Sequence, residues 1–233
     1  MKPVTIKAAS SHIVYDADVL SAPQPALFET AYWRGQEALE GSAPGRGSSS
    51  FVRMATGSAV LRRYLRGGWV ARWNRDRYWY TGLARSRPFR EFELLRRMSA
   101  DGLRVPTPLA ALCDRHGLFY RAALLTERIA PAQPLESHCG ASNFDWSHLG
   151  RALAEFHRAG VGHADLNARN ILIHDGTGEV WLIDFDRCSY RPGQPVSGQG
   201  QLDRLQRSCR KFWPPQGADF AGSWKALMQG YDA

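Results

Sequence analysis

Residues 163–170 read HADLNARN and residues 184–186 read DFD, and these two segments decide the fold of the chain. Two short apolar runs, ILIH and VWLIDF, flank the turn sequence DGTG, a pattern that predicts a β-hairpin. The two strands of such a hairpin bring the residues before the first strand beside the residues after the second. Asp165, Asn170 and Asp184 are therefore expected to lie close together.

These three side chains fit the transfer of a phosphoryl group from a nucleotide to a hydroxyl. Such a transfer needs a carboxylate that orients the attacking hydroxyl, and oxygen ligands for the Mg²⁺ that bridges the β- and γ-phosphates. Asp165 is the candidate catalytic base, and Asn170 and Asp184 are the candidate metal ligands. Each residue alone has an ordinary explanation as a turn residue, a helix cap or a strand-end acid. The joint spacing carries the interpretation.

A helix, an H-x-D-x₄-N loop, a short hairpin and D-F-x follow one another here, and this order resembles the catalytic core of the protein kinases. The resemblance implies an α+β, two-lobed protein-kinase-like fold that uses ATP and Mg²⁺. The N-lobe would be an antiparallel sheet with one main helix, and the C-lobe a reduced, mostly helical unit with the catalytic hairpin. The expected division is residues 1–126 for the N-lobe, with an N-terminal extension, 127–134 for the hinge and 135–233 for the C-lobe.

A small-residue stretch upstream resembles the glycine-rich loop that covers the phosphates in kinases. It contains Gly45, Gly47 and Ser48, with Ser50 in place of the third glycine. Backbone N–H groups of such a loop approach phosphates at little steric cost. The signal is weak by itself, because a flexible linker has the same composition, and no Gly-Lys-Ser/Thr follows as in a Walker loop.

The strand sequence AVLR resembles the V-A-I-K of kinases, with Arg62 in place of the lysine. Arg62 or its neighbour Arg63 would neutralise the α- and β-phosphates. Glu91 is the best candidate to hold that arginine, although both charges could instead be solvated. The sequence LLTERIA lies where a kinase has its hinge, so the backbone of Glu127 and Ile129 would bind the adenine edge.

Apolar periodicity predicts the other elements near the candidate site. Helices are expected over residues 24–40, 88–100 and 145–159, the last with Asp145 as its N-cap. Strands are expected on both sides of a Thr-Gly turn at 56–57 and in the runs PLAALCD and LFYRAALLTERI. His157 and His163 are expected to be structural histidines rather than catalysts.

The charge of the chain favours an anionic partner. Its net charge is +8, and residues 46–104 hold fourteen arginines and four acids but no lysine. Arginine suits a bidentate grip on phosphate or carboxylate. No run approaches the roughly 20 apolar residues of a spanning helix, and the first twenty residues lack the apolar core of a secretory signal. A cytoplasmic protein is expected. The four cysteines form no C-x-x-C pair, which argues against a zinc site.

Several departures from the protein-kinase pattern indicate an acceptor other than a protein. Ala164 replaces the arginine of H-R-D, Asn167 replaces the usual lysine, and Asp186 replaces the glycine of D-F-G. No A-P-E follows, and 47 residues remain after Asp186. This length is too short for an activation segment and a peptide-docking subdomain. A small-molecule or glycolipid hydroxyl is the better acceptor.

Longer phrases are similar to a narrower family, the bacterial 3-deoxy-D-manno-octulosonic acid (Kdo) kinases of the lipopolysaccharide-kinase branch. These phrases are YRAALLTERI, GVGHADLNARNILI, VWLIDFDRCSYR, VLRRYLRGG and LDRLQRSCRK. The resemblance implies transfer of the ATP γ-phosphate to the 4-hydroxyl of Kdo on a lipid A precursor. It also implies peripheral attachment to the cytoplasmic face of the inner membrane, within lipopolysaccharide core assembly.

The arginine-rich segment also contains aromatic residues that suit a membrane interface, although they could equally be core residues. They are Trp69, Trp73, Tyr78, Trp79 and Tyr80. Two other functions stay open. A kinase for lipopolysaccharide heptose would share every catalytic residue named above. A basic pseudokinase that binds nucleotide or RNA would explain the charge, but the intact catalytic set and the lack of an RNA-recognition motif argue against it, so no nucleic-acid partner is expected.

Overall fold

The computed structural model describes residues 1–42, 49–65 and 76–233. They form two compact units, Met1–Arg97 with Pro106–Arg128 and Met98–Val105 with Ile129–Ala233. The boundary between Arg128 and Ile129 falls inside the 127–134 segment expected as a hinge. The grouping of residues 98–105 with the second unit has no signal in the sequence pattern. No helix within the described ranges is long and apolar enough to cross a bilayer.

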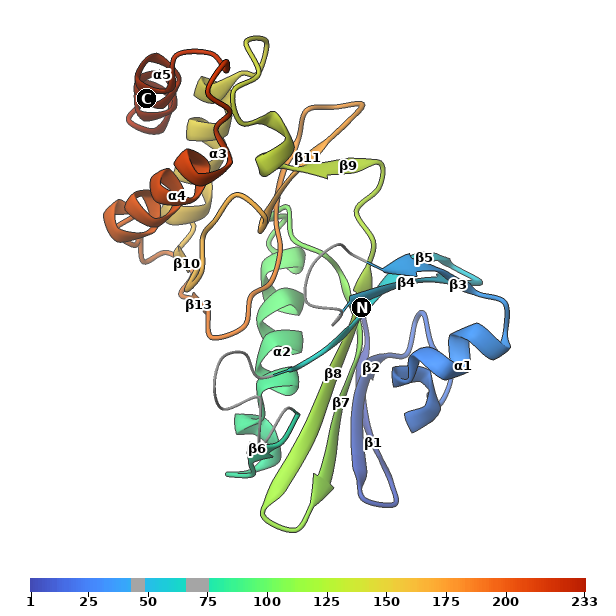
Figure 1. The fold of residues 1–233 in the computed structure, drawn as a ribbon. Helices are drawn as coiled ribbons and strands as arrows, with labels where there is room; N and C mark the ends of the chain where they lie inside the picture. The colour runs from blue at the N-terminus through green and yellow to red at the C-terminus, as the bar shows by residue number, and fades with distance from the viewer. Residues whose placement is uncertain (43–48, 66–75) are drawn as a thin grey trace. The chain divides into compact units, whose positions relative to one another are not determined.

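The first unit is built on an antiparallel sheet with the strand order β1-β2-β7-β8-β5-β4-β3, and β6 pairs with β8 (Figure 1). The strands are β1 (Pro3–Ala8), β2 (Ser11–Asp16), β3 (Leu39–Ser42), β4 (Ser49–Met54), β5 (Gly57–Arg63), β6 (Tyr78–Trp79), β7 (Pro108–His116) and β8 (Phe119–Glu127). The strands expected around the Thr-Gly turn and in the two later runs are confirmed as β4, β5, β7 and β8. Positive φ angles at Gly57 and Gly117 allow the tight turns that join β4 to β5 and β7 to β8.

Helix α2 (Arg87–Ala100) covers one face of this sheet, as expected from its apolar spacing (Figure 1). Phe92 and Leu95, in the part of the helix that belongs to this unit, are buried. Burying large apolar side chains of this kind contributes roughly 1.5–3 kcal/mol each. The helix ends before Gly102, which takes the left-handed conformation (φ +78°) that terminates many helices.

The continuous helix expected over residues 24–40 is wrong. The segment instead forms a 3₁₀ turn, η1 (Pro25–Phe28), a short helix, α1 (Thr30–Gly35), and then strand β3. Glu29 is extended (φ −109°, ψ 129°) and Glu37 is left-handed (φ +53°), and neither conformation continues an α-helix. The apolar spacing reflects Phe28 and Trp33, which are buried in the core cluster of the sheet.

One of the aromatic residues expected at an interface belongs to the core. Tyr78 is 8% exposed and its ring lies 5.7 Å from that of Tyr120 on β8. Trp79 is 62% exposed, because alternate residues of a strand point to opposite faces. Trp69 and Trp73 lie outside the described residues. The 3₁₀ turn η3 (Leu83–Arg85) then leads into α2.

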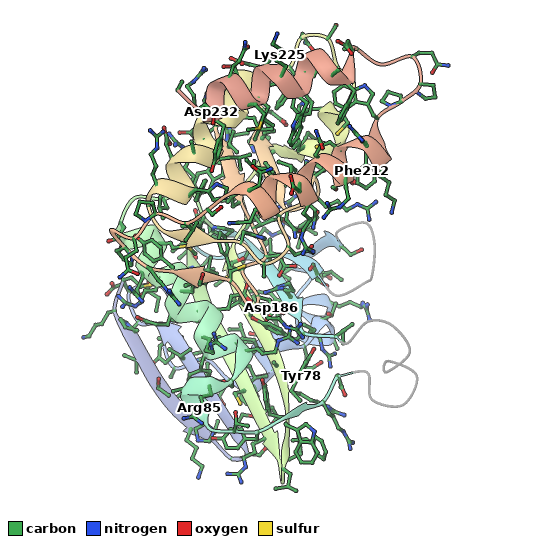
Figure 2. All side chains as sticks on the ribbon, turned by 90° about the vertical axis from the view of Figure 1, so that its left-hand side faces the viewer. Tyr78, Arg85, Asp186, Phe212, Lys225 and Asp232 are labelled. Carbon is green, nitrogen blue, oxygen red and sulfur yellow. The ribbon has the colours of Figure 1, made fainter. Side chains whose placement is uncertain are left out.

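The second unit contains α3 (Trp146–Arg158), α4 (Gln199–Phe212) and α5 (Phe220–Tyr231), together with two small sheets (Figures 1 and 2). The sheets pair β12 (Val180–Leu182), β11 (Ile171–His174) and β9 (Ala132–Pro134), and separately β10 (Val161–Gly162) and β13 (Ser189–Tyr190), and η4 (Leu135–His138) follows β9. Helix α3 is confirmed, including its N-cap, because Asp145 Oδ1 accepts the His148 N–H at 2.8 Å. Helices α4 and α5 are not among the elements expected from the sequence.

Helices α3 and α5 pack closely because two glycines lie where they touch. A Cβ atom on Gly150 would overlap the backbone of Leu227, and one on Gly230 would overlap the backbone of Ser147. His157, at the end of α3, is buried and hydrogen-bonds the hydroxyl of Tyr231 through Nδ1 at 2.7 Å. The expectation that this histidine is structural is confirmed. Helix α3 is thus held against α5, and it ends shortly before the segment 163–170.

Candidate active site

The predicted hairpin is present and brings the two motif segments together. Strands β11 and β12 pair with Ile171 opposite Leu182, and the Ile183 N–H donates to the Asn170 carbonyl at 3.0 Å. Asn170 therefore lies beside the residue that precedes Asp184. The proximity follows from local chain geometry, since a short hairpin fixes which residues flank its open end.

The loop's own amide side chains hold Asp165 in place. Asn170 Nδ2 donates to the Asp165 carbonyl at 2.9 Å. Asn167 Nδ2 lies 3.0 Å from both the carbonyl and Oδ2 of Asp165, and Asn167 Oδ1 accepts the Arg169 N–H at 2.9 Å. Because Asn170 Nδ2 is hydrogen-bonded to the Asp165 carbonyl, Asn170 Oδ1 is the side-chain atom that remains for a metal ion. An amide oxygen and a carboxylate are the hard oxygen ligands that Mg²⁺ prefers.

Asp184 has the backbone geometry of a residue at a sharp change of direction. Its φ angle is +63°, in the left-handed region that asparagine and aspartate tolerate better than most residues. The Asp184 side chain is exposed, whereas the next residue, Phe185, is buried. The ring of Phe185 meets that of His163 edge to face, with centroids 5.0 Å apart. This conformation leaves the carboxylate at the surface while the aromatic ring anchors the segment.

His163 is buried beneath the loop and connects its two halves. Its Nδ1 accepts the Asp165 N–H at 3.2 Å, and its Nε2 donates to the Ile183 carbonyl at 3.0 Å in the matching neutral tautomer. Burial lowers the pKa of His163 and so favours that neutral form. The imidazole spans Asp165 and Ile183 without reaching the surface. Its expected supporting role is confirmed.

Helix α4 also binds the loop 163–170, the candidate catalytic loop, through side chains spaced three and four residues apart. Gln201 Oε1 accepts the His163 N–H at 2.7 Å, and Ser208 Oγ accepts the Ala168 N–H at 3.1 Å. Between them, Arg204 Nη1 lies 3.3 Å from Asp165 Oδ1. Sequence reasoning missed these contacts. The available signal was a helical apolar spacing of buried residues in the same segment, namely Leu202, Leu205 and Cys209.

In the first unit, the expected partner of Glu91 is Arg62. Arg62 Nη2 lies 2.5 Å from Glu91 Oε1, and Glu91 is almost completely buried on α2. The hydroxyl of Tyr64, which sequence reasoning missed, donates to Glu91 Oε2 at 2.5 Å. Arg63 pairs instead with the exposed Glu29, at 3.2 Å. The structure therefore brings Glu91 together with one of the two candidate arginines.

The remaining predicted residues belong to the loop and hinge segments. Glu127 ends β8, and its N–H donates to the Thr107 carbonyl at 2.8 Å, so this donor is already used within the first unit. Ile129 begins the long segment of the second unit. The glycine-rich loop residues Gly45, Gly47 and Ser48 lie outside the described residues.

Comparison with known proteins identifies the family of this chain. The model of the lipopolysaccharide kinase (Kdo/WaaP) family matches residues 30–231. The chain belongs to this family. It is therefore a kinase. It is 40% identical to the 3-deoxy-D-manno-octulosonic acid kinase of Vibrio vulnificus strain YJ016, over 96% of this chain and 95% of the relative. It is 42% identical to the enzyme of the same name from Xylella fastidiosa strain M23, over 94% of this chain and 89% of the relative.

Two solved structures show the fold that this family member shares. One is WaaP in complex with acyl carrier protein, with a TM-score of 0.54 and 19% identity over 92% of this chain and 88% of that chain. The other is an aminoglycoside phosphotransferase from Streptomyces rimosus in complex with ADP and streptomycin, with a TM-score of 0.54 and 15% identity over 85% of this chain and 88% of that chain. The expected α+β protein-kinase-like fold is confirmed.

Proposed function

We propose that this kinase transfers the γ-phosphate of ATP to the Kdo residue of a Kdo–lipid A precursor, at the 4-hydroxyl, in lipopolysaccharide core biosynthesis. The assignment of the acceptor rests on the 40% identity to a Kdo kinase over almost the full length of both chains. Two features of the second unit support the chemistry: an exposed Asp165 and a hairpin that brings Asn170 next to the segment of Asp184.

Asp165 acts as the catalytic base in this proposal. Its carboxylate accepts the proton of the acceptor hydroxyl while that oxygen forms a bond to the γ-phosphorus. The bond between this phosphorus and the β,γ-bridging oxygen breaks, and ADP leaves with the electron pair. Asn167 and His163 hold the Asp165 carboxylate and backbone in position, so that little reorganisation is needed when the hydroxyl arrives.

Asn170 and Asp184 are the proposed ligands of Mg²⁺. The donor set fits the ion, because the Nδ2 of Asn170 is bonded to the Asp165 carbonyl and leaves an amide oxygen for the metal. When bound, the ion neutralises charge on the β- and γ-phosphate oxygens. The exposed carboxylate of Asp184 and the tethered amide of Asn170 need only hold their oxygen atoms toward the nucleotide.

Residues of the first unit are proposed to bind the rest of the nucleotide. Arg62, held by Glu91, supplies positive charge for the α- and β-phosphates. The backbone of Gly45, Gly47 and Ser48 is proposed to cover the phosphates, and the backbone of Glu127 and Ile129 to bind the adenine edge. Residues 1–126 are proposed to form the N-lobe, residues 127–134 the hinge and residues 135–233 the C-lobe.

We further propose that the protein acts at the cytoplasmic face of the inner membrane, where a lipid A precursor is accessible. The net charge of +8 suits a surface of anionic lipids. Trp79 is exposed and lies against Phe119 with ring centroids 4.6 Å apart and the ring planes tilted by 40°, which places an amphipathic indole at the surface of the first unit. Binding to vesicles with and without anionic lipid, at low and high salt, tests this point. Equal binding to neutral and anionic vesicles would contradict it.

The acceptor is tested with purified protein, labelled ATP and Mg²⁺. Kdo–lipid A, a heptose-bearing core and casein are offered separately, with Asp165→Ala as the inactive control. The proposal expects label on Kdo–lipid A and none on casein. Preferential labelling of the heptose-bearing core would favour the heptose kinase, and ATP binding without turnover on any acceptor would favour the pseudokinase.

A further inference from the structure

One face of α4 follows the catalytic loop, and Arg204 lies at its centre. Gln201 and Ser208 accept backbone N–H groups of the loop on either side, at 2.7 and 3.1 Å. These two contacts fix the position of the helix relative to the loop. Between them, the guanidinium of Arg204 meets the Asp165 carboxylate at 3.3 Å. The helix therefore delivers a positive charge to the side chain proposed as catalytic base.

The ion pair is placed for binding rather than for folding. Arg204 is 50% exposed and Asp165 is 63% exposed. Pairs with this exposure contribute little to folding stability, because water screens both charges. Within the described part of the chain, Arg204 hydrogen-bonds to Asp165 through Nη1. Its guanidinium has five N–H donors, so most of them remain for oxygen atoms that approach Asp165.

Two other cations of the second unit are engaged elsewhere. Arg169 Nε lies 2.6 Å from Glu136 Oε2, and its guanidinium lies over the ring of Phe212, the last residue of α4. Arg210 stacks on Phe220 at 5.0 Å. The catalytic loop itself carries Asn167 where protein kinases have a lysine. Arg204 is thus the cation that directly contacts the base in the described part of the chain.

We propose that Arg204 is a specificity-determining residue that binds the carboxylate of the sugar acid whose hydroxyl is presented to Asp165. The inference rests on the proposed function, in which the acceptor is a 3-deoxy sugar acid. Such an acceptor brings a second carboxylate close to the base, because C3 alone separates the carbon that bears the carboxyl group from the carbon that bears the 4-hydroxyl. Two carboxylates repel each other unless a cation lies between them.

Arginine suits this role because its donors form a planar fork. One edge stays on Asp165 while another edge binds the two oxygens of the acceptor carboxylate. The same contact orients the sugar ring, so that its hydroxyl faces the base. A neutral sugar would leave these donors without a partner and would be bound less tightly.

The test compares Kdo–lipid A with Kdo–lipid A whose carboxyl group has been reduced to an alcohol, both in detergent micelles with saturating Mg²⁺·ATP. The wild-type kinase is expected to prefer the acid by about 10- to 100-fold in kcat/KM, as for loss of one charge-assisted hydrogen-bonded contact. Arg204→Gln should lose about the same factor on the acid, mainly through a higher KM, and less than about threefold on the reduced acceptor. The KM for ATP should stay within about twofold.

Two further variants serve as a conservative substitution and a control for Arg204→Gln. Arg204→Lys keeps the charge but not the fork, and it should recover part of the preference for the acid. Arg207→Gln removes an exposed charge from the same helix and should behave as the wild type. The comparison of the two acceptors with the wild-type kinase uses no substitution, so this part of the test does not depend on how well Arg204→Gln folds.

The outcomes separate this inference from the proposed function. Equal wild-type rates on the acid and the reduced acceptor overturn the role of Arg204 while leaving the Kdo kinase in place. Equal losses of Arg204→Gln on both acceptors overturn it as well, and assign Arg204 to the base or the phosphate instead. A wild-type protein that labels neither acceptor but labels a heptose-bearing core overturns the proposed function, and this inference with it.

Discussion

Glu91 of α2 is 3% exposed, and Arg62 of β5 approaches it to 2.5 Å. The guanidinium also lies over the ring of Tyr64, 4.7 Å from its centroid, and the tyrosine hydroxyl donates to the second carboxylate oxygen. A buried carboxylate is costly unless it is paired and hydrogen-bonded, and here both conditions are met from two side chains of one short segment. The pair therefore contributes to folding and to the proposed phosphate site at once.

We expect Arg62→Met to lower the free energy of unfolding by about 2–4 kcal/mol, because Glu91 then loses its cation and keeps the tyrosine hydroxyl. Arg62→Met/Glu91→Leu should recover much of that loss, since no buried charge remains, while ATP affinity stays low. Urea unfolding and nucleotide titration measure the two effects separately. Arg63→Met, which removes an exposed pair with Glu29, is the control and should cost less than about 1 kcal/mol. A double variant with normal ATP affinity would contradict the role of Arg62.

Asp165→Asn should reduce kcat by about 10²- to 10⁴-fold, the usual contribution of a general base. ATP affinity should change less than about threefold, because the proposed base would contact the acceptor hydroxyl rather than the nucleotide. Asp203→Asn removes an exposed carboxylate of α4 and is the matched control. Steady-state rates and equilibrium ATP binding decide the matter. Near-normal turnover of Asp165→Asn would remove the assignment of the base.

For Asp184, the left-handed backbone determines which substitution is informative. Asp184→Asn keeps a side chain that tolerates φ +63°, so its fold should be retained while the Mg²⁺ concentration for half-maximal rate rises by about tenfold or more. Asp184→Ala should add a backbone penalty of about 1 kcal/mol, visible in thermal unfolding. Rates over a Mg²⁺ titration test the first point. An unchanged Mg²⁺ requirement would count against the metal-ligand assignment.

The buried histidines make stability depend on pH. Burial lowers the pKa of both His157 and His163, so the unfolded chain binds protons at a higher pH than the folded chain. Their contribution is present above the unfolded pKa and is lost as the pH falls through the folded pKa. The urea midpoint should therefore be lower at about pH 5.5 than at about pH 7.5. His163→Gln should show a smaller drop over the same window, and a drop as large as that of the wild type would contradict this prediction.

The contact between α3 and α5 should not tolerate a methyl group. Gly150→Ala would place Cβ against the backbone of Leu227, and we expect a loss of about 2–3 kcal/mol in the free energy of unfolding. Gly200→Ala, in α4, meets no atom within 4 Å and should instead gain about 0.5–1 kcal/mol from the lower chain entropy of alanine. Urea unfolding of the two variants side by side checks the difference. Similar stability of both would show that the helices can separate without cost.

The features that the sequence predicted are those fixed by near neighbours in the chain. The hairpin follows from its turn and its apolar runs, and it alone brings Asn170 beside the residue before Asp184. The N-cap of α3 and the side of α2 that carries Glu91 follow from local spacing in the same way. Such patterns involve few residues, so they can be recognised without knowing the rest of the fold.

The features that were missed depend on contacts between distant parts of the chain. Arg204 meets Asp165 across 39 residues, and no local pattern marks that contact. The segment at 24–40 has helical apolar spacing, yet Phe28 and Trp33 use it to cover the sheet from two separate turns. Tyr78 and Trp79 are adjacent and similar in type, and only strand pairing decides which of them is buried.

The attachment of α4 to the loop has a consequence for how such chains are recognised. A fragment that stopped at residue 198 would still contain the whole pattern from His163 to Asp186, and a motif search would score it as complete. It would lack Gln201 and Ser208, the two side chains that hold the loop's amide groups. In this chain, the loop that carries Asp165 is thus held by side chains that lie outside the segment from His163 to Asp186.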